Sequence, residues 1–365
     1  MTQKMLLSIC LTLSVPYCFA APEITSITID NSDGKNFIEI HGTGFGVGPN
    51  VVLFDTFSKD KEGDQVSLSS PEIGSWSNFG IYGGKPIITA INNQNNGFLI
   101  HDFSNGGEIK IAQLETIFSK DQTEIFMNFD VFIPEGATFP GSSTVNSMPS
   151  VSSWKFSWLV DGTGISNDGI YDLVVPSHTG RGSFAVGGNE FLFDWISSSW
   201  FSYKEINRIS FWQKANKASP ATENGEYYFR GMSKDEGVFV DNRNDKPIFA
   251  PGLVSNSFDR VRFPGWTGNG DQSKSNVIYD NIYVAVGENS LARIELGMVS
   301  DYNGNGMPKI FPPDVWQDNY IKVSLIPEDE LVGSYIFVTN AQGETTQTGK
   351  TICGKCPVKV DLFIE

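Results

Sequence analysis

Short segments in which apolar and polar residues alternate recur from one end of the chain to the other. Residues 37–41 read Phe-Ile-Glu-Ile-His, and residues 358–364 carry Val, Val, Leu and Ile at every second position. Alternation with a period of two is typical of β-strands that bury one face. No segment has a sustained period of 3.6 residues, and clusters of Gly, Ser, Asn and Asp separate the alternating segments. The pattern therefore predicts an all-β protein.

The segment His41–Phe57 marks the boundary between two predicted units. Glycines stand at every second position from Gly42 to Gly48, where they allow turn and bulge conformations that other residues avoid. An apolar run with high β-propensity follows at residues 51–54. We interpret this segment as the end of a small β-domain followed by the first strand of a larger one.

The strands before this boundary resemble the start of an IPT/TIG domain, which is an immunoglobulin-like β-sandwich. The matching residues are Pro22-x-Ile24-x-x-Ile27 and Ile38-x-Ile40-x-Gly42-x-Gly44-Phe45-Gly46. Two strands cannot bury a core alone, but alternating segments at residues 292–297, 316–323 and 333–340 supply the missing ones. We expect residues 21–50 and 290–346 to form one domain, interrupted by an insertion at residues 51–289. Two separate small β-domains are the alternative.

The predicted insertion, residues 51–289, resembles the concanavalin A-like jelly roll of lectins and secreted polysaccharide-active proteins. The residues that carry the resemblance are Phe-Asp-Thr-Phe at 54–57, Ile-Ser-Phe-Trp-Gln-Lys at 209–214 and Ile-Tyr-Asp-Asn-Ile-Tyr-Val at 278–284. The resemblance implies a large sandwich whose last strand returns beside its first. The predicted fold class is thus all-β, with a concanavalin A-like jelly-roll sandwich inserted into a small immunoglobulin-like (IPT/TIG) β-sandwich.

The N-terminus predicts export. Residues 1–20 combine Lys4, an apolar stretch too short to span a bilayer, and small residues before a cleavage point after Ala20, as in a signal peptide. No later segment predicts a transmembrane helix, so we expect a secreted or cell-surface protein. With 26 Lys and Arg against 42 Asp and Glu, the formal net charge is −16, which disfavours nucleic acid as a partner. The sequence predicts no particular oligomeric state.

No catalytic constellation stands out in the sequence. The Glu-x-Asp-x-x-Glu strand of many jelly-roll glycosidases is missing, and Arg293-Ile294-Glu295-Leu296 is similar to only one of the three strands typical of jelly-roll polysaccharide lyases. We therefore expect a secreted non-catalytic carbohydrate-binding or adhesive protein with an extracellular glycan as partner, and the missing motifs favour a protein without enzymatic activity. The alternatives are a polysaccharide-degrading enzyme (lyase or glycoside hydrolase) with an unrecognised active site, and a structural matrix or surface protein.

Asp55 and Asp280 are candidate metal ligands. They lie in the predicted first and last strands of the insertion, and pairing of those strands would bring the two carboxylates together. Two close carboxylates repel each other unless a cation or a proton relieves them, and calcium is the natural cation outside cells. Two independent turn or edge aspartates are the alternative interpretation.

Aromatic residues are candidate glycan-binding residues, because sugar rings stack on aromatic planes. We favour Trp266, which stands in the Gly/Pro-rich segment 264–270, and next Trp212, Tyr227 and Trp158. A tryptophan in a sandwich is otherwise a core residue. In the C-terminal strand predicted for residues 347–365, Cys353 and Cys356 predict a local disulfide, with free thiols as the alternative.

Overall fold

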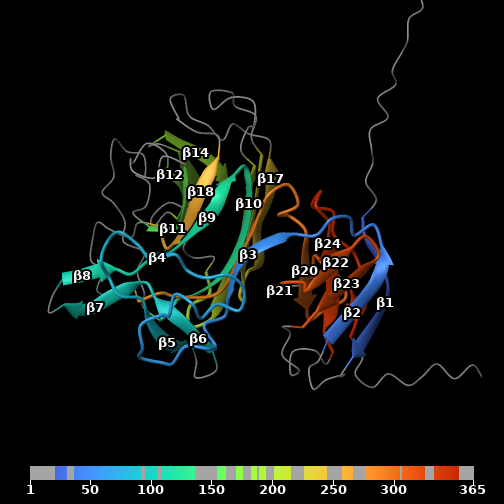
Figure 1. Ribbon diagram of the computed structural model, residues 1–365, viewed down its shortest axis with the longest axis horizontal. Coiled ribbons are helices and arrows are strands. Elements are labelled where there is room, and N and C mark those ends of the chain that lie inside the picture. The colour runs from blue at the N-terminus through green and yellow to red at the C-terminus, as the bar shows by residue number, and fades with distance from the viewer. Residues whose placement is uncertain are drawn as a thin grey trace, which may run out of the picture.

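The computed structural model describes residues 21–30, 37–91, 95–105, 108–135, 154–161, 170–175, 182–186, 189–194, 201–214, 226–244, 257–265, 276–304, 306–324 and 333–352. Within these residues every helix or strand assigned is a β-strand, which confirms the predicted all-β class. No helix in this part of the chain is long and apolar enough to cross a membrane. The strands form a large sandwich and a smaller one beside it (Figure 1).

The large sandwich consists of an eight-stranded and a seven-stranded antiparallel sheet, which is the jelly-roll arrangement that the sequence predicted. The eight-stranded sheet has the order β17 (Gly237–Asn244), β16 (Glu226–Ser233), β15 (Ile206–Lys214), β10 (Glu124–Phe132), β19 (Ile278–Val286), β6 (Asn95–Leu99) and β5 (Ile87–Ile91), with β3 (Asn50–Asp55) also paired to β19. The seven-stranded sheet has the order β14 (Asn189–Asp194), β13 (Gly182–Val186), β12 (Ile170–Val175), β11 (Trp154–Asp161), β18 (Phe258–Phe263), β9 (Leu114–Gln122) and β4 (Asn78–Phe79). A separate hairpin joins β7 (His101–Asn105) to β8 (Glu108–Ile111).

Alternate residues of the facing strands build the core between these two sheets. Phe129 of β10 stacks on Tyr279 of β19 with ring centroids 5.4 Å apart, and Phe263 of β18 packs edge-on against Phe129 from the opposite sheet. The buried hydroxyl of Tyr279 donates a hydrogen bond of 3.0 Å to the carbonyl of Phe156 on β11. Side chains from both sheets therefore interlock in one apolar layer, as in other aligned sandwiches.

The first and last strands of the large sandwich pair with each other, as the sequence predicted. Phe54 of β3 stands opposite Tyr283 of β19, and Asn50 stands opposite Val286. The chain thus leaves the large sandwich next to the place where it entered. An insertion into another domain requires this closeness of entry and exit.

The smaller sandwich combines segments from both ends of the chain. Its first sheet has the order β1 (Glu23–Asp30), β2 (Phe37–Thr43), β23 (Tyr320–Val323) and β22 (Val315–Gln317). Its second sheet has the order β21 (Lys309–Phe311), β20 (Arg293–Gly297), β24 (Tyr335–Thr339) and β25 (Lys350–Thr351). Ile38 and Ile40 of β2 stand opposite Val323 and Ile321 of β23, and all four are buried in one core.

The two sandwiches meet through the outer face of the eight-stranded sheet. Phe126 and Trp212 on that face share an apolar cluster with Leu291 and Ile310 of the smaller sandwich. The indole Nε1 of Trp212 donates a hydrogen bond of 3.1 Å to the hydroxyl of Ser290. The smaller sandwich therefore packs against part of the outer face of the eight-stranded sheet, and the seven-stranded sheet lies on the far side of the jelly roll (Figure 1).

Candidate functional site

Four side chains form a line across the outer face of the seven-stranded sheet. Asn78 of β4 stands opposite Glu115 of β9, Glu115 stands opposite Arg262 of β18, and Arg262 stands opposite Trp158 of β11. Their chain neighbours, among them Leu114, Val261, Phe263 and Leu159, belong to the core. Because successive side chains of a strand point to opposite faces, the four residues point away from the core. We call this set the transverse row.

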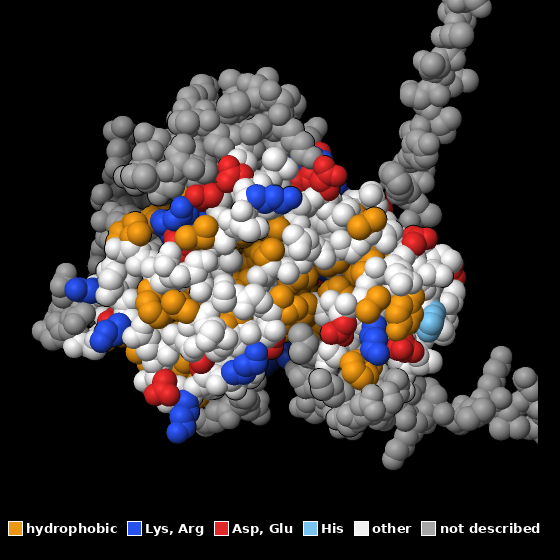
Figure 2. All heavy atoms as spheres, in the orientation of Figure 1, with side chains coloured by type: hydrophobic (Ala, Val, Ile, Leu, Met, Phe, Trp, Pro, Cys, Tyr) orange, Lys and Arg blue, Asp and Glu red, His pale blue; other side chains and the backbone are white. Residues whose placement is uncertain are grey.

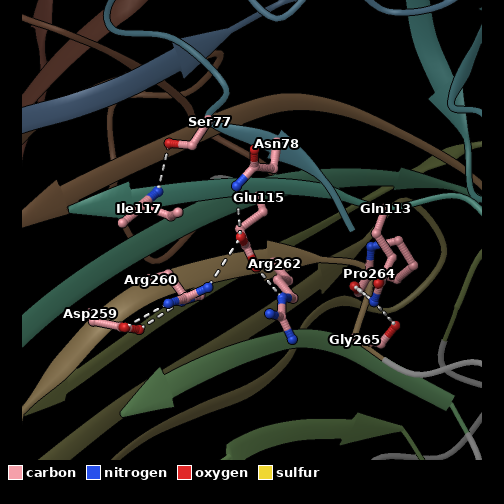
Figure 3. A network of polar contacts seen from close by, with 10 residues as sticks. All are labelled: Ser77, Asn78, Gln113, Glu115, Ile117, Asp259, Arg260, Arg262, Pro264 and Gly265. Atoms are coloured by element: carbon pink, nitrogen blue, oxygen red, sulfur yellow. Dashed lines mark hydrogen bonds and ion pairs between the residues drawn. The ribbon is translucent and has the colours of Figure 1, made fainter. Parts of the chain in front are cut away.

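Glu115 is at the centre of the polar contacts in the transverse row (Figure 3). The guanidinium Nε of Arg262 donates to Glu115 Oε2, and Nη1 of Arg260 donates to Oε1 at 3.3 Å. The amide of Asn78 contacts the same Oε1 at 3.4 Å. Arg262 and Glu115 are both nearly inaccessible to water, so each needs the other's charge.

Arg260 joins a second carboxylate to this network. Its Nε and Nη2 donate to the two carboxylate oxygens of Asp259 at 2.9 and 2.8 Å, which is a bidentate pair. This hydrogen bond to Asp259, together with the charge of Glu115, raises the pKa of Arg260 above its usual value. Two guanidinium groups and two carboxylates thus lie side by side on one face of β18 and β9 (Figure 3).

Trp158 adds an aromatic surface to the row. Its ring centroid lies 6.0 Å from that of Tyr82 and 5.9 Å from the Arg262 guanidinium carbon. Gly265 packs so closely that a Cβ atom there would come within 2.8 Å of Trp158 Cδ1, so only glycine fits without displacement. The glycine therefore lets the indole pack directly against the backbone at residue 265.

Two polar atoms beside the row lack a hydrogen-bond partner among the described residues. They are the indole Nε1 of Trp158 and the side-chain Oε1 of Gln113, whose amide nitrogen donates to the carbonyls of Pro264 and Gly265 at 3.0 and 2.9 Å. Buried polar atoms are nearly always hydrogen-bonded, and the exceptions call for a physical explanation. A donor and an acceptor beside an aromatic ring and a fixed guanidinium suit the hydroxyls and the carboxylate of a sugar acid.

The structure places the four predicted glycan-binding residues differently. Trp158 lies in the transverse row on the outer face of the seven-stranded sheet, where it is 5% exposed. Trp212 is buried between the two sandwiches, where it bonds to Ser290, and Tyr227 is buried in the core of the jelly roll. Packing contacts enclose both of these side chains, so neither is exposed to a ligand. Trp266 lies outside the described residues.

Asp55 and Asp280 lie close in the sheet but on opposite faces. Asp55 stands opposite Ile282, a core residue, and accepts a hydrogen bond of 2.7 Å from the indole of Trp76. Asp280 stands opposite Asp130, on the side of the sheet that faces the smaller sandwich. Strand pairing brought the residues together, as predicted, but the pleat separated their carboxylates. We therefore propose no calcium site at this pair, and the described residues contain no cluster of three or more His, Cys, Asp or Glu able to hold a metal.

The carboxyl groups of Asp55 and Asp280 are buried, and burial raises the pKa of each. Burial raises the pKa of Asp55 to about 7, although Trp76 and the backbone N–H of Phe57 oppose the rise. Burial, followed by the charge of Asp130, raises the pKa of Asp280 well above its usual value. Asp130 itself is paired with Arg208 through two hydrogen bonds of 2.6 and 2.7 Å. The predicted disulfide residues Cys353 and Cys356 lie outside the described part of the chain.

Sequence analysis did not single out Glu115, Arg260 or Arg262. Residues 258–263 read Phe-Asp-Arg-Val-Arg-Phe, an alternation that puts both arginines on one face of β18. The sequence thus contained a signal for the two arginines. The position of Glu115 opposite them depends on the pairing of β9 with β18, and Arg260 and Glu115, which are hydrogen-bonded, are 145 residues apart in the chain. A local pattern cannot supply such a register.

Comparisons with known proteins concern the fold. No protein-family model matches the chain, and no curated protein matches it. Among solved structures, the marine PL-14 alginate lyase from Aplysia kurodai is similar at 10% identity, covering 66% of this chain and 100% of that chain with a TM-score of 0.44. An alginate lyase from a Chlorella virus (12% identity, 66% and 93% covered, TM-score 0.37) and a Bacillus licheniformis β-glucanase (7% identity, 65% and 98% covered, TM-score 0.35) are similar too.

These comparisons correct the predicted function. A non-catalytic carbohydrate-binding or adhesive protein was expected, but the similar solved structures include alginate lyases and a β-glucanase, whose names denote enzymes that act on polysaccharides. The expectation had depended on catalytic strand motifs that the sequence lacks. The names of these neighbours agree with the alternative, a jelly-roll enzyme with an unrecognised active site. The likenesses assign no residue of this chain a role.

Proposed function

We propose that the protein is a polysaccharide-degrading enzyme that acts at the transverse row on the seven-stranded sheet. The observation that carries the proposal is the Glu115–Arg262–Trp158 line, in which a carboxylate orients a guanidinium beside an aromatic ring. Trp158, which is 5% exposed, would border a bound sugar, and its unpartnered indole N–H would donate to a hydroxyl. A buried polar group without a hydrogen bond is costly, and a ligand hydroxyl would remove that cost.

β-Elimination fits these residues better than hydrolysis. Glycosidases use two carboxyl groups about 5–10 Å apart on either side of the scissile bond. Here Glu115 and Asp259 are both already bonded to arginine. Asp172 stands opposite Trp158 on the next strand, β12, three strand spacings from Glu115, or about 14 Å of backbone separation. The site therefore presents arginine side chains to a substrate rather than two free carboxyl groups at the distance that hydrolysis requires.

In the proposed elimination, Arg262 binds the carboxylate of a uronate unit and neutralises its charge. This makes the proton on the neighbouring carbon, C5, more acidic, and a base removes it. The electron pair left behind forms the C4–C5 double bond, the bond from C4 to the glycosidic oxygen breaks, and that oxygen takes up a proton. Tyr82, beside Trp158, is our candidate for the group that exchanges the proton, a role for which tyrosine is suited in general.

The chemistry of the two reactions provides the test. Elimination creates new reducing ends together with a conjugated double bond that absorbs in the ultraviolet, whereas hydrolysis creates reducing ends alone. The full-length protein would be incubated with polygalacturonate, alginate and a neutral β-glucan. We expect ultraviolet-absorbing products from a polyuronate and none from the glucan. Reducing ends without absorbance would show a hydrolase, and no products from any polymer would contradict an enzyme of this class.

The export and domain predictions belong to the same proposal. We propose a secreted protein in which residues 21–50 and 290–346 form an IPT/TIG-like domain that carries the enzyme. The shared core of β2 and β23 supports one interrupted domain, since Ile40 and Ile321 pack together although they are far apart in the chain. Detection of the mature chain in the culture medium, beginning at residue 21, would test the export.

A further inference from the structure

A pocket of about 370 Å³ lies on the outer face of the eight-stranded sheet. It is at the end of the jelly roll where β5, β6 and β7 lie, at the lower left of Figure 1. The residues that line it come from these strands, from β19 and from the segments that follow β10 and precede β19: Thr89, Leu99, Phe103, Pro134, Asn276 and Ile278. The transverse row belongs to the other sheet, and nothing in the proposed function uses this pocket.

The floor of the pocket is apolar and well packed. Leu99 of β6 stands opposite Ile278 of β19, and their chain neighbours Phe98 and Tyr279 belong to the core. Because side chains alternate along a strand, Leu99 and Ile278 point to the outer face. Ile278 is buried there in a small apolar cluster with Phe132, and Leu99 packs against this cluster. The pocket therefore has a fixed floor of aliphatic side chains.

Phe103 supplies an aromatic wall. It is 41% exposed, and its ring centroid lies 6.1 Å from that of His101 in an edge-on arrangement. The backbone beside it is held by Asp102, whose carboxylate accepts hydrogen bonds from the N–H groups of Ser104 and Lys85 at 2.9 and 3.0 Å. The ring and the aliphatic floor together make a continuous apolar surface that is open to solvent, which is typical of a ligand-binding groove.

Two uncharged polar side chains complete the lining. Thr89 stands opposite Gly97, and its chain neighbour Ile88 belongs to the core, so the side chain of Thr89 lies on the outer face. Asn276 is exposed beside Ile278. A hydroxyl and an amide both donate and accept hydrogen bonds, as the hydroxyls of a sugar require. An aromatic ring, an apolar floor and a few polar groups are the usual composition of a ligand pocket.

The lining favours an uncharged ligand. None of the lining residues that the structure describes is charged, and the whole chain has a formal net charge of −16. A carboxylate bound here would lose its hydration without meeting a cation, which is costly. The polyuronate of the proposed function therefore belongs at Arg262 and not in this pocket. A purely aliphatic ligand is disfavoured as well, because it would cover Thr89 and Asn276 without replacing their hydrogen bonds to water.

We propose that this pocket binds a neutral glycan, with a sugar ring against Phe103 and sugar hydroxyls hydrogen-bonded to Thr89 and Asn276. A sugar ring presents apolar C–H groups to an aromatic plane and hydroxyls at its edge, so it uses both kinds of lining residue. At 370 Å³ the pocket is near the lower end of the range of about 300–1,000 Å³ for small-molecule sites, which suits a short segment of a polysaccharide. The enzyme would then hold a neutral chain on one sheet while it degrades a polyuronate on the other.

Calorimetric titration of the full-length protein with uncharged probes tests the site. The probes are cellohexaose, laminarihexaose and mannohexaose, with decanol as an aliphatic control. We expect at least one of the oligosaccharides to bind and decanol not to bind. Phe103→Ala should weaken the binding about tenfold, by analogy with the loss of an aromatic stacking partner in other ligand sites. It should leave the melting temperature nearly unchanged, because Phe103 is exposed.

Matched variants locate the effect. Phe79→Ala removes a phenylalanine of similar exposure, 37%, from β4 of the other sheet and should keep full binding of the neutral oligosaccharide. Arg262→Lys, which alters the transverse row, should keep it too. Thr89→Val preserves the shape of the side chain but removes its hydroxyl. This variant should weaken binding about threefold, so it serves if Phe103→Ala does not fold.

The measurements separate this pocket from the proposed function. Phe103→Ala should leave kcat/KM on a soluble polyuronate unchanged, and binding of a neutral oligosaccharide is observable whether or not any polymer is degraded. The site would be overturned if none of the oligosaccharides binds, or if binding survives both Phe103→Ala and Thr89→Val. Binding of decanol in place of the oligosaccharides, abolished by Phe103→Ala, would overturn the assignment to a glycan.

Discussion

Glu115 and Arg262 stand directly opposite each other on β9 and β18, and the guanidinium Nε of Arg262 donates to Glu115 Oε2. Their side chains are only 4% and 6% exposed although they point away from the core. Side chains on the outer face of a sheet are ordinarily solvated, so an ion pair buried there is a costly arrangement for stability alone.

Glu115→Gln should lower the free energy of unfolding by about 2–4 kcal/mol, because it leaves the buried charge of Arg262 uncompensated and also weakens the contact with Arg260. Urea unfolding followed by tryptophan fluorescence measures the change. The matched control is Glu226→Gln, which loses only half-exposed ion pairs with Lys214 and Arg243 and should cost less than about 1 kcal/mol. Equal losses in the two variants would contradict a buried, interdependent pair.

Arg262→Lys should affect catalysis more than stability. The variant keeps a positive charge near Glu115 but lacks the planar fork that binds a carboxylate through two hydrogen bonds. We expect kcat/KM on a polyuronate to fall about 100-fold, equivalent to roughly 3 kcal/mol, with a change in melting temperature of a few degrees at most. Steady-state rates of ultraviolet-absorbing product measure this. An unchanged kcat/KM would exclude Arg262 from the reaction.

Trp158→Phe and Trp212→Phe should differ in their effect on binding. Trp158 is buried and its indole N–H has no partner among the described residues, so its replacement should cost about 1 kcal/mol of packing without loss of a hydrogen bond and should weaken oligosaccharide binding about fivefold to tenfold. Trp212 donates to Ser290, so its replacement should cost about 1 kcal/mol of stability and leave binding unchanged. Calorimetric titration and urea unfolding of both variants measure the contrast. The reverse pattern would show that the ligand lies elsewhere.

The buried carboxyl of Asp55 predicts a pH dependence of stability. Its pKa is raised to about 7 by burial, whereas an unfolded aspartate has a pKa near 3.9. Between about pH 4 and pH 7 the folded protein keeps a proton that the unfolded chain releases, so the free energy of unfolding falls as the pH rises through this window. Above pH 7 this contribution stays constant. The total fall is on the order of 4 kcal/mol.

Asp55→Asn mimics the protonated side chain and should flatten this part of the profile. The variant retains one oxygen to accept a hydrogen bond from Trp76 or from the Phe57 N–H, so the comparison concerns slopes rather than absolute stabilities. Urea unfolding at intervals from pH 4 to pH 8 measures both proteins. A variant with the slope of the parent protein would place the titrating group elsewhere, with Asp280 the next candidate because burial raises its pKa as well.

The described part of one face of the molecule shows no basic patch that would attract an anionic substrate (Figure 2). On the face drawn in Figure 2, acidic and basic side chains are interspersed rather than gathered into one basic patch. A chain with a formal net charge of −16 repels polyanions at long range. At the proposed site a polyuronate would depend on short contacts with arginines such as Arg262. Added salt screens both this attraction and the long-range repulsion, so we expect it to change binding little.

The sequence by itself determined the strand content, because alternation is a local property of a strand with one buried face. It also determined that β3 and β19 pair, since the resemblance to jelly rolls predicts a last strand that returns beside the first. Local alternation further places Arg260 and Arg262 on one face of β18. The strand content and the common face of the two arginines follow from residues that are neighbours in the chain, whereas the pairing of β3 with β19 followed from the resemblance alone.

Only the tertiary structure decided what those faces meet. Trp158 and Trp212 occur in similar alternating segments, yet one lies beside Arg262 and the other is packed under the smaller sandwich. Asp55 and Asp280 share neighbouring strands, but the register and pleat direct their carboxylates to opposite faces. The physical reason is that register and sheet packing depend on contacts between residues hundreds of positions apart. A periodic pattern shows which side chains share a face, whereas only the packing of distant strands determines whether that face meets core, neighbouring domain or ligand.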